Sequence, residues 1–228
     1  MKHYNIIGDI HGRTCWKQLV KDDCVNIFVG DYFDPYEKIS FAELLYNFND
    51  LIAYKQQHPE MVLLYGNHDL HYISSADRSS RYNHLHAQEI CKAFDDNKNL
   101  FYGVAYSIET HTLVTHAGVT KEWYEKMFGT YNGESPEIVA NNINSLWQQD
   151  KTQFSFRANS DNPYDIYGEA PTHSPLWIRP WVLAKHNLFA QTPYKQVFGH
   201  TQVRDIATIG NNLTCVDCLG TVEKALYL

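Results

Sequence analysis

The sequence contains no long apolar run and carries little positive charge. Its 228 residues include 19 Lys and Arg against 26 Asp and Glu, which gives a formal net charge of −7. This acidic balance argues against binding to an extended nucleic acid, because a phosphate backbone is held by clustered basic side chains. The amino-terminal stretch MKHYNIIGDIHG has no segment suited to a signal peptide or a membrane span. We therefore expect a cytoplasmic protein without membrane or nucleic-acid partners.

Cysteine is scarce, and its spacing does not indicate a disulfide framework. The number of cysteines is odd, five, and Cys15, Cys24 and Cys91 are scattered as reduced thiols in a core would be. Cys215 and Cys218 form one CxxC pair, a pattern found in redox and zinc sites. The chain has no second CxxC and no nearby CxxH, so two small residues on a late strand are the favoured interpretation.

The bulk composition is that of one globular domain. Hydrophobic residues make up 44% and charged residues 20%, which are ordinary values for a folded protein. The chain is long enough to bury a substantial core, and it shows neither an internal repeat nor a low-complexity tract. We expect a single domain over residues 1–228.

Short apolar runs alternate with helical patterns through the first half of the chain. Strands are predicted at Asn5–Ile7, Asn26–Val29, Met61–Tyr65 and Leu113–His116. Helices are predicted at Thr14–Val20, after the capping residue Ser40, and at His86–Lys98. This alternation is typical of an α/β domain with helices packed on a sheet.

The chain changes character after Gly118. Helices are predicted at Val119–Phe128 and Pro136–Gln149, whereas residues 150–180 are rich in Pro, Asn, Asp, Ser and aromatics and look irregular. Strands return at the following ranges, where a hairpin-like β region is expected: Gln196–Phe198, Asp205–Ile209, Asn212–Val216 and Thr221–Leu228. We interpret residues 119–195 as an insertion that shapes a substrate site within the domain.

Polar motifs follow the apolar runs directly, namely GDIHG, GDYFDP, GNHD and THAG. Turns beyond strand ends gather functional groups in α/β folds, so these motifs can meet in space. Asp9 and His11 are two residues apart, and on an extended segment both would face one point. A carboxylate and an imidazole would then reach one metal ion.

Further ligand types stand at other strand ends. Asp31 can bridge two metals through its two oxygens, and Asn67 offers a neutral oxygen. His116 and His200 offer imidazoles just past apolar strands. Each residue alone is more often structural, but Asp, Asn or His at five separate strand ends together indicates a metal site. Mixed oxygen and imidazole donors suit Mn, Fe, Zn, Co or Ni better than Ca or Mg.

The ordered motifs resemble those of the calcineurin-like metallophosphoesterase superfamily. The matching blocks are GDIHG (Gly8–Gly12), GDYFD (Gly30–Asp34), GNHD (Gly66–Asp69), THAG (Thr115–Gly118) and FGHT (Phe198–Thr201). They span nearly the whole chain and are highly specific as an ordered set. Within the superfamily the chain resembles the phosphoprotein-phosphatase branch, especially bacterial Ser/Thr protein phosphatases and diadenosine-tetraphosphatase-like members.

This resemblance implies a four-layer sandwich of two mixed β-sheets flanked by helices, with two metal ions at the strand ends. One ion would be held by Asp9, His11 and Asp31, and the other by Asp31, Asn67, His116 and His200. Many members read GHxH in the last motif, where this chain has Gln202 in place of the second His. The single-His form matches the phosphoprotein-phosphatase branch.

The resemblance also implies a reaction. His68, paired with Asp34, would lie outside the metal shell and protonate the leaving oxygen as a metal-bound hydroxide attacks phosphorus. The implied cofactors are two transition-metal ions, with Mn favoured and Fe, Zn, Co or Ni as alternatives.

One departure from the family pattern concerns the substrate phosphate. Members of this branch usually carry a phosphate-binding Arg directly after Asp34, where this chain has Pro35. Arg179, in a Trp-x-Arg segment, is the first candidate for that contact, and Arg78 and Arg81 are the others. Each of the three can instead be a solvated surface residue.

The resemblance implies a phosphorylated substrate, whose class stays open between a phosphoprotein, a nucleotide or dinucleoside polyphosphate, and another small molecule. Aromatics of the insertion can stack on a base, although aromatics are more often core; they are Trp123, Trp147, Phe154, Tyr164, Tyr167, Trp177 and Trp181. A different class is a non-catalytic binding scaffold of the same fold, which predicts damaged motifs. Every ligand position here carries a suitable residue, which favours an enzyme.

Overall fold

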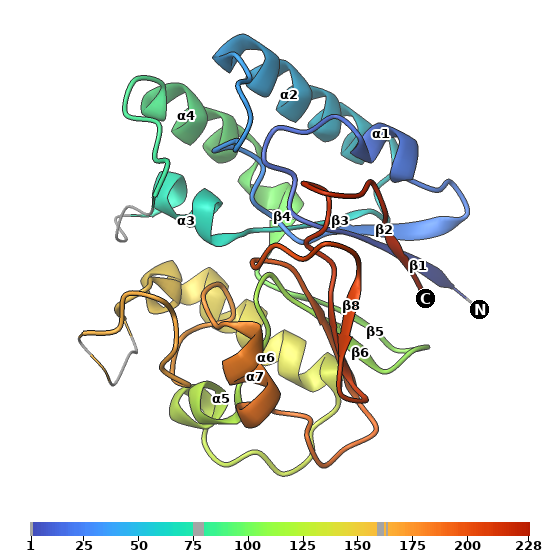
Figure 1. Cartoon of the computed structure of the whole chain (residues 1–228), viewed down its shortest axis with the longest axis vertical. Coiled ribbons are helices and arrows are strands. Elements are labelled where there is room, and N and C mark those ends of the chain that lie inside the picture. The colour runs from blue at the N-terminus through green and yellow to red at the C-terminus, as the bar shows by residue number, and fades with distance from the viewer. Residues whose placement is uncertain (1, 75–79, 159–161, 163) are drawn as a thin grey trace.

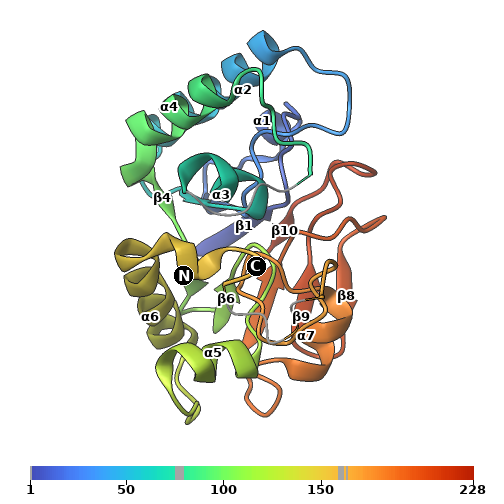
Figure 2. The ribbon, with the colours of Figure 1, turned by 90° about the vertical axis from the view of Figure 1, so that its left-hand side faces the viewer.

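Two five-stranded sheets lie face to face in the middle of the molecule, and helices cover their outer faces (Figure 1). This computed structural model describes residues 2–74, 80–158, 162 and 164–228. Over the first sheet lie α1 (Trp16–Leu19), α2 (Phe41–Gln57) and α4 (Ala87–Asn97). Over the second lie α5 (Lys121–Phe128), α6 (Pro136–Gln149) and α7 (Pro180–His186), as the turned view also shows (Figure 2). The four-layer α/β sandwich with two mixed sheets is therefore confirmed.

The first sheet has the strand order β10-β1-β2-β3-β4. Its strands are β1 (His3–Ile7), β2 (Cys24–Phe28), β3 (Val62–Leu64), β4 (Phe101–Tyr102) and β10 (Leu226–Tyr227). The four strands from β1 to β4 run parallel, and β10 is antiparallel to β1. Parallel neighbours bring their carboxyl ends to one edge, which is where the polar motifs begin.

The second sheet has the strand order β5-β6-β7-β9-β8. Its strands are β5 (Ala105–Ser107), β6 (Thr112–Val114), β7 (Lys195–Phe198), β8 (Ala207–Ile209) and β9 (Leu213–Cys215). The central strands β6, β7 and β9 are parallel, and the two edge strands are antiparallel to their neighbours. The mixed sheet thus also presents parallel carboxyl ends at its centre.

Two of the predicted helices begin at the expected capping residues. The Ser40 side chain accepts the backbone amide of Glu43, and the Glu43 carboxylate accepts the Ser40 amide at 2.9 Å, which forms a capping box for α2. The Ser135 side chain accepts the amide of Ile138, with Pro136 in the first turn of α6. The start of both helices was therefore readable from local sequence.

Strand residues alternate between two parts of the core. Ile6 and Ile27 belong to a buried cluster that contains residues of both sheets and so lies between them. Their neighbours Ile7 and Phe28 belong to the larger cluster that includes the helices. Because successive strand side chains point to opposite faces, nearly continuous apolar runs are what a sheet buried on both faces requires.

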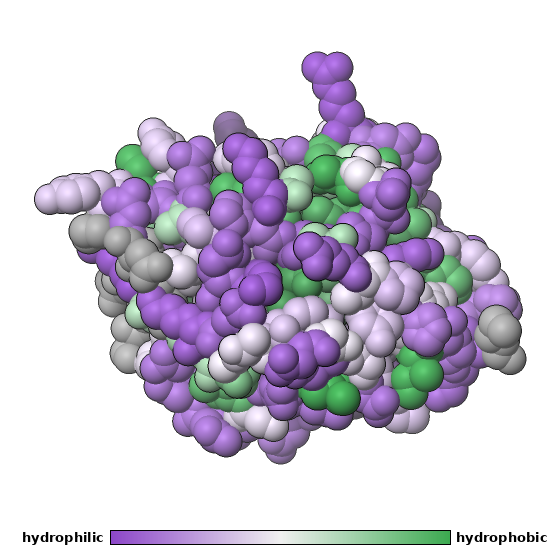
Figure 3. Space-filling model, turned by 90° about the horizontal axis from the view of Figure 1, so that it is seen from below, coloured by the Kyte–Doolittle hydropathy of each residue, from purple (hydrophilic) through white to green (hydrophobic). Residues whose placement is uncertain are grey.

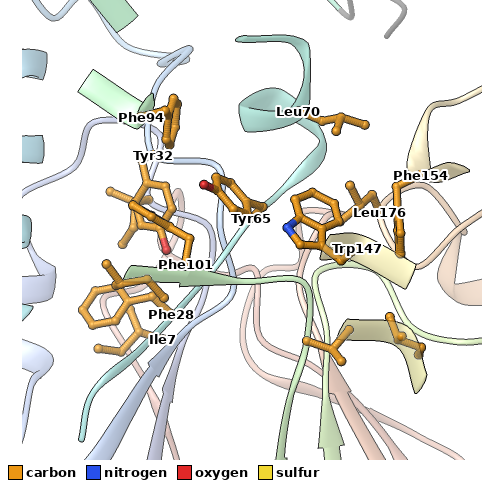
Figure 4. Close-up of a cluster of buried hydrophobic side chains, with 14 of the residues drawn as sticks. Ile7, Phe28, Tyr32, Tyr65, Leu70, Phe94, Phe101, Trp147, Phe154 and Leu176 are labelled. Atoms are coloured by element: carbon orange, nitrogen blue, oxygen red, sulfur yellow. The ribbon is translucent and has the colours of Figure 1, made fainter. Parts of the chain in front are cut away.

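Buried aromatic side chains join the first sheet to the second half of the chain (Figure 4). Tyr65, which follows β3, stacks on Trp147 of α6 with ring centroids 5.1 Å apart, and Trp147 meets Phe154 edge-on at 4.9 Å. Trp123 is also fully buried, whereas the exposed aromatics of residues 119–195 include Tyr164, Tyr167 and Trp181. Trp123, Trp147 and Phe154 therefore serve the core and are not available to stack on a base.

The face seen from below in Figure 3 is mainly hydrophilic, with hydrophobic side chains in small separate groups. Isolated apolar side chains of this kind are ordinary on protein surfaces. Within the described part of the chain, no helix combines the length and hydropathy that crossing a membrane requires.

The cysteines are all unpaired, and both members of the CxxC pair are buried. Cys215 ends β9, and its thiol donates to the carbonyl of Thr201 at 3.4 Å. Burial raises the pKa of Cys215 to about 12, which is the character of a packed thiol rather than of a reactive thiolate. The pair is therefore part of the core.

The fold differs from the sequence-based expectations in several places. GNHD is not a loop, since α3 (Asn67–Ile73) begins within it. Helix α7 begins at the last residue of the stretch 150–180 that was predicted to be irregular, and it had not been assigned from the sequence. Of the expected closing strand Thr221–Leu228, only Leu226–Tyr227 forms a strand, and it pairs with β1 in the first sheet. The carboxy-terminal hairpin consists of β8 and β9 alone, because the last strand fills the open edge beside β1.

Candidate metal centre

The predicted motifs meet at the carboxyl ends of the central strands. GDIHG, GDYFD and GNHD follow the parallel strands β1, β2 and β3, while THAG and FGHT follow β6 and β7 of the other sheet. Backbone hydrogen bonds join the first two loops, because the His11 amide donates to the Asp31 carbonyl at 2.6 Å. The structure brings together all six predicted ligands, which are buried or, for the last, half-buried: Asp9, His11, Asp31, Asn67, His116 and His200.

The spacing of Asp9 and His11 suggested that they lie on an extended segment, and this prediction is wrong. Strand β1 ends at Ile7, and His11 has a left-handed φ of 44°. Asp31 and His200 are also left-handed, with φ of 56° and 67°. Such backbone is costly for residues other than glycine and persists where surrounding contacts enforce it. The ligand side chains converge because these loops turn sharply.

Two glycines allow carboxylates to approach the backbone closely. A Cβ atom on Gly66 would lie 2.0 Å from Oδ1 of Asp31, and one on Gly199 would lie 2.0 Å from Oδ1 of Asp9. A larger residue at either position would displace a predicted ligand. The glycines of GNHD and FGHT are therefore required by the geometry of the site.

Asp69, the last residue of GNHD, is not a predicted metal ligand, and it joins the loop after β2 to the loop after β3. Its carboxylate accepts backbone amides from Asp31 at 2.8 Å, from Tyr32 at 3.0 Å and from Gly66 at 2.8 Å. Because this one buried carboxylate binds both loops, it holds Asp31 and Asn67 in fixed positions relative to each other.

Ligand atoms from both sheets meet at Asn67. Its Oδ1 lies 2.7 Å from Nε2 of His116 and 2.8 Å from Nδ1 of His200. The backbone amide of His200 donates to the Asp9 carboxylate at 3.0 Å. The loops of the second sheet are thus attached directly to those of the first.

Two imidazoles approach the same carboxylate oxygen of Asp31. Its Oδ2 lies 3.5 Å from Nε2 of His11 and 3.6 Å from Nε2 of His116. The other ring nitrogen of each histidine is occupied, since Nδ1 of His11 lies 3.2 Å from the Phe33 carbonyl and Nδ1 of His116 lies 2.9 Å from the Val29 carbonyl. Nδ1 therefore carries the proton when either ring is neutral.

A histidine must be neutral at one ring nitrogen to bind a metal ion, so the protonation of His11 and His116 shows whether these residues suit a metal site. Burial lowers the pKa of His11 to about 4 and also lowers the pKa of His116, so both rings are neutral near pH 7. The Nε2 lone pair of each ring then faces oxygen atoms, which is a donor arrangement that suits a bound cation. Ligand atoms of Asp9, Asp31 and His116 all lie within 4.8 Å of one another. The donor set of carboxylate, amide and neutral imidazole fits a transition metal.

The sequence-based prediction missed Asp217, a further carboxylate beside the site. It is fully buried after β9, and one of its oxygens has no partner among the described residues. Burial raises the pKa of Asp217 to about 7, with Asp31 adding to the rise. Burial, and then the charges of Asp217 and Asp31, raise the pKa of Asp9. The position of Asp217 directly after a predicted strand was the sequence signal that could have identified it.

His68 and Asp34 form the predicted pair. Nδ1 of His68 lies 2.9 Å from Oδ2 of Asp34, and the His68 backbone amide donates to Asp31 at 2.9 Å. Burial lowers the pKa of His68, but the charges of Asp31 and Asp34 outweigh it and the pKa is raised. His68 is therefore suited to hold a proton that it can donate.

Helix α3 brings two further residues to Asp34. Nε2 of His71 lies 2.8 Å from Oδ2 of Asp34, and the Tyr72 hydroxyl donates to Oδ1 at 2.5 Å. The sequence-based prediction missed both residues because it placed GNHD in a loop. Helical spacing from His68 to His71 and Tyr72 would have shown them on one side of a helix. Asp34 is thus held from several directions.

Because His68 is the predicted proton donor, His71→Leu is expected to lower kcat about 10–100-fold, the usual effect of losing an outer partner of such a group. His71 would act through Asp34 on His68, so KM and metal content should stay at their wild-type values. His71→Gln, whose amide can donate to Asp34, should recover part of the loss. Steady-state kinetics joined to metal analysis checks this, and a parallel loss of bound metal would contradict a positioning role.

A cavity of about 450 Å³ opens beside the predicted ligands. Asp31, Asn67, His68 and His200 line it. The other lining residues are Tyr36, Ser80, Phe156, Arg157, Ile166, Trp177 and Arg179. The cavity therefore joins the ligand cluster to side chains that can contact the rest of a substrate.

The three candidate arginines have different positions. Arg179 lines the cavity, and its guanidinium donates to the Tyr167 carbonyl at 2.6 Å and to the Thr201 hydroxyl at 3.3 Å. Arg81 stacks on Tyr36, with its guanidinium carbon 3.4 Å from the ring centroid. Arg78 lies outside the described residues. Arg179 and Arg81 thus lie near the site and come from different segments, although the chain has no Arg at the family position directly after Asp34.

A two-sheet sandwich that gathers carboxylate, amide and imidazole side chains at its strand ends defines the class of metal-dependent phosphoesterases. A family model confirms this assignment, since residues 3–214 match the calcineurin-like phosphoesterase family. The chain belongs to that family and is a hydrolase of phosphate esters. No curated protein matches the sequence.

Solved structures of low sequence identity share the fold. A mutant cold-active protein tyrosine phosphatase matches with a TM-score of 0.63 and 17% identity, over 100% of this chain and 75% of that chain. A protein serine/threonine phosphatase from Saccharomyces cerevisiae, with similarity to human phosphatase PP5, matches with a TM-score of 0.53 and 15% identity. This second match covers 94% of this chain and 66% of that chain.

Proposed function

We propose that this protein is a two-metal phosphoesterase in which Asp31 bridges the ions. The observation that carries the proposal is that Oδ2 of Asp31 lies 3.5 Å from Nε2 of His11 and 3.6 Å from Nε2 of His116. One carboxylate oxygen lies between two neutral imidazoles, as a bridging ligand would. Asp9, His11 and Asp31 would hold the first ion, and Asp31, Asn67, His116 and His200 would hold the second. Manganese is the favoured metal, with Fe, Zn, Co or Ni as alternatives.

The residues around the ions divide the catalytic work. Bound metals lower the pKa of water and neutralise charge on phosphoryl oxygens. His68 protonates the leaving oxygen through Nε2, because Asp34 occupies Nδ1 at 2.9 Å. Arg179 binds a phosphoryl oxygen, and its contacts with Tyr167 and Thr201 hold the guanidinium at the cavity.

The substrate is proposed to be a phosphorylated side chain or nucleotide, in the manner of the phosphoprotein-phosphatase branch. Residues 119–195 supply much of the cavity wall, since Phe156, Arg157, Ile166, Trp177 and Arg179 line it. This supports a single domain in which that segment shapes the substrate site. Among the solved structures of similar fold are a tyrosine and a serine/threonine protein phosphatase, which agrees with a phosphoprotein substrate. Dinucleoside polyphosphates are the second candidate.

The experiment that tests the proposal joins metal analysis to an activity panel. The purified protein, with Mn added, is assayed on p-nitrophenyl phosphate, phosphopeptides, nucleotides and dinucleoside polyphosphates. We expect about two metal ions per chain and hydrolysis that a chelator abolishes. A protein that holds two ions but hydrolyses none of these substrates would instead be the non-catalytic scaffold of the same fold.

A further inference from the structure

Strained backbone points to a residue outside the proposed metal and proton-transfer groups. Among the described residues, the non-glycine residues with positive φ are His11, Asp31, Asp34, Arg81, His111 and His200. Four of them are predicted metal ligands or catalytic residues. His111 belongs to the turn between β5 and β6. The remaining residue, Arg81 with a φ of 63°, lies in a turn that follows α3 in the chain.

The Arg81 side chain covers Tyr36. Its guanidinium carbon lies 3.4 Å from the Tyr36 ring centroid, which is a close stacked cation–π contact. The ring is also edge-on to the proposed ligand His11, with centroids 4.8 Å apart at 88°. Tyr36 is therefore held between a cation and the metal centre, although 45% of its surface is exposed.

The exposed part of Tyr36 belongs to the cavity. Tyr36 lines the same space as Asp31, Asn67 and His200. A phenol hydroxyl beside the proposed metal ligands is a hydrogen-bond donor for an anion.

We propose that Tyr36 is a substrate-binding residue whose hydroxyl donates to a phosphoryl oxygen, and that Arg81, stacked on its ring, positions it. This inference rests on the proposed phosphoesterase function and names its substrate class, a terminal phosphomonoester. Arg179 supplies a guanidinium to the same cavity from another segment. Donors from both segments suit a terminal phosphate with three free oxygens better than a diester, in which one of these oxygens is esterified.

Tyr36→Phe, which removes only the hydroxyl, is the direct test. We expect kcat/KM for p-nitrophenyl phosphate to fall about 10–100-fold, the weight of a hydrogen bond to a charged group. Inhibition by inorganic phosphate should weaken in parallel, and activity on bis-p-nitrophenyl phosphate should change much less. Metal content and thermal unfolding should match the wild type.

Two variants of Arg81 test whether this residue positions Tyr36. Arg81→Gln should act in the same direction as Tyr36→Phe, and Arg81→Lys, which keeps the charge but not the planar stack, should recover part of the loss. Tyr46→Phe is the matched control, because Tyr46 is an exposed tyrosine beside a cation, Lys17, outside the cavity.

The outcomes distinguish this inference from the function on which it rests. A wild-type protein with two bound ions and no phosphoesterase activity would overturn the proposed function. An active wild type whose Tyr36→Phe variant keeps its kcat/KM and phosphate inhibition would overturn the substrate contact alone. Equal losses on the monoester and the diester would overturn the proposed substrate class. If Tyr36→Phe does not fold, the same readouts on the Arg81 variants decide.

Discussion

The Asp31→Asn variant is expected to lose both tightly bound metal ions. Its activity should fall at least about a thousandfold, because the ions stabilise the charge of the transition state by several kcal/mol. Oδ2 of Asp31 lies within 3.5 Å of His11 and 3.6 Å of His116, which belong to different proposed metal sites. An amide carries no charge and offers one oxygen instead of two. A single substitution therefore weakens both sites at once.

The Asp31→Asn variant should still fold. Oδ1 of Asp31 accepts the backbone amide of His68 at 2.9 Å, and an amide oxygen can retain that bond. The new nitrogen can donate to an imidazole lone pair of His11 or His116, which removes an unfavourable contact of the metal-free protein. Metal analysis after gel filtration, joined to thermal unfolding and kcat/KM, checks these expectations.

Asp205→Asn is the matched control for this variant. Asp205 is an exposed aspartate that pairs with Lys224, so its substitution should leave metal content and activity unchanged. An Asp31→Asn protein that retained two tightly bound ions would refute the bridge, even if its turnover were reduced.

His68→Asn should reduce kcat by about 10²–10⁴-fold, the usual contribution of a general acid. Metal content should stay constant because His68 contacts Asp34 and donates its amide to Asp31 without being a proposed ligand. The loss should be larger for an alkyl phosphate than for p-nitrophenyl phosphate, since a good leaving group needs less protonation. Steady-state kinetics on both substrates measures this difference.

His58→Asn provides the control for His68→Asn. His58 lies at the end of α2 and pairs with Glu60, so its substitution should leave both substrates unaffected. Unchanged hydrolysis of an alkyl phosphate by His68→Asn would remove His68 from the mechanism. A loss of metal together with activity would assign it a structural role instead.

Local sequence patterns predicted the elements that position the site. Apolar runs marked the strands β1, β2, β3, β6 and β7, and each predicted ligand follows one of them. The caps Ser40 and Ser135 were visible because they act on amides only three residues away. By contrast, Leu226–Tyr227 pairs with β1, a partner more than 200 residues away that no local pattern identifies.

The conformation of the motifs could not be predicted in the same way. The spacing of Asp9 and His11 suggested an extended segment, but His11 is left-handed because the loop after β1 pairs with the loop after β2. His71 was missed because α3 begins at Asn67 directly after β3. Asp217 was missed because it belongs to no motif, and its charge acts on Asp9 only in the folded chain.

The local sequence was enough to predict which chemical groups meet at the candidate site, because ligand type is a property of each residue and the strands that carry the motifs are locally encoded. The ligands predicted in this way are Asp9, His11, Asp31, Asn67, His116 and His200. The folded chain was needed to show that one oxygen of Asp31 lies near both His11 and His116, and that Arg81 stacks on Tyr36. These relations depend on sharp left-handed turns and on contacts between segments far apart in the chain.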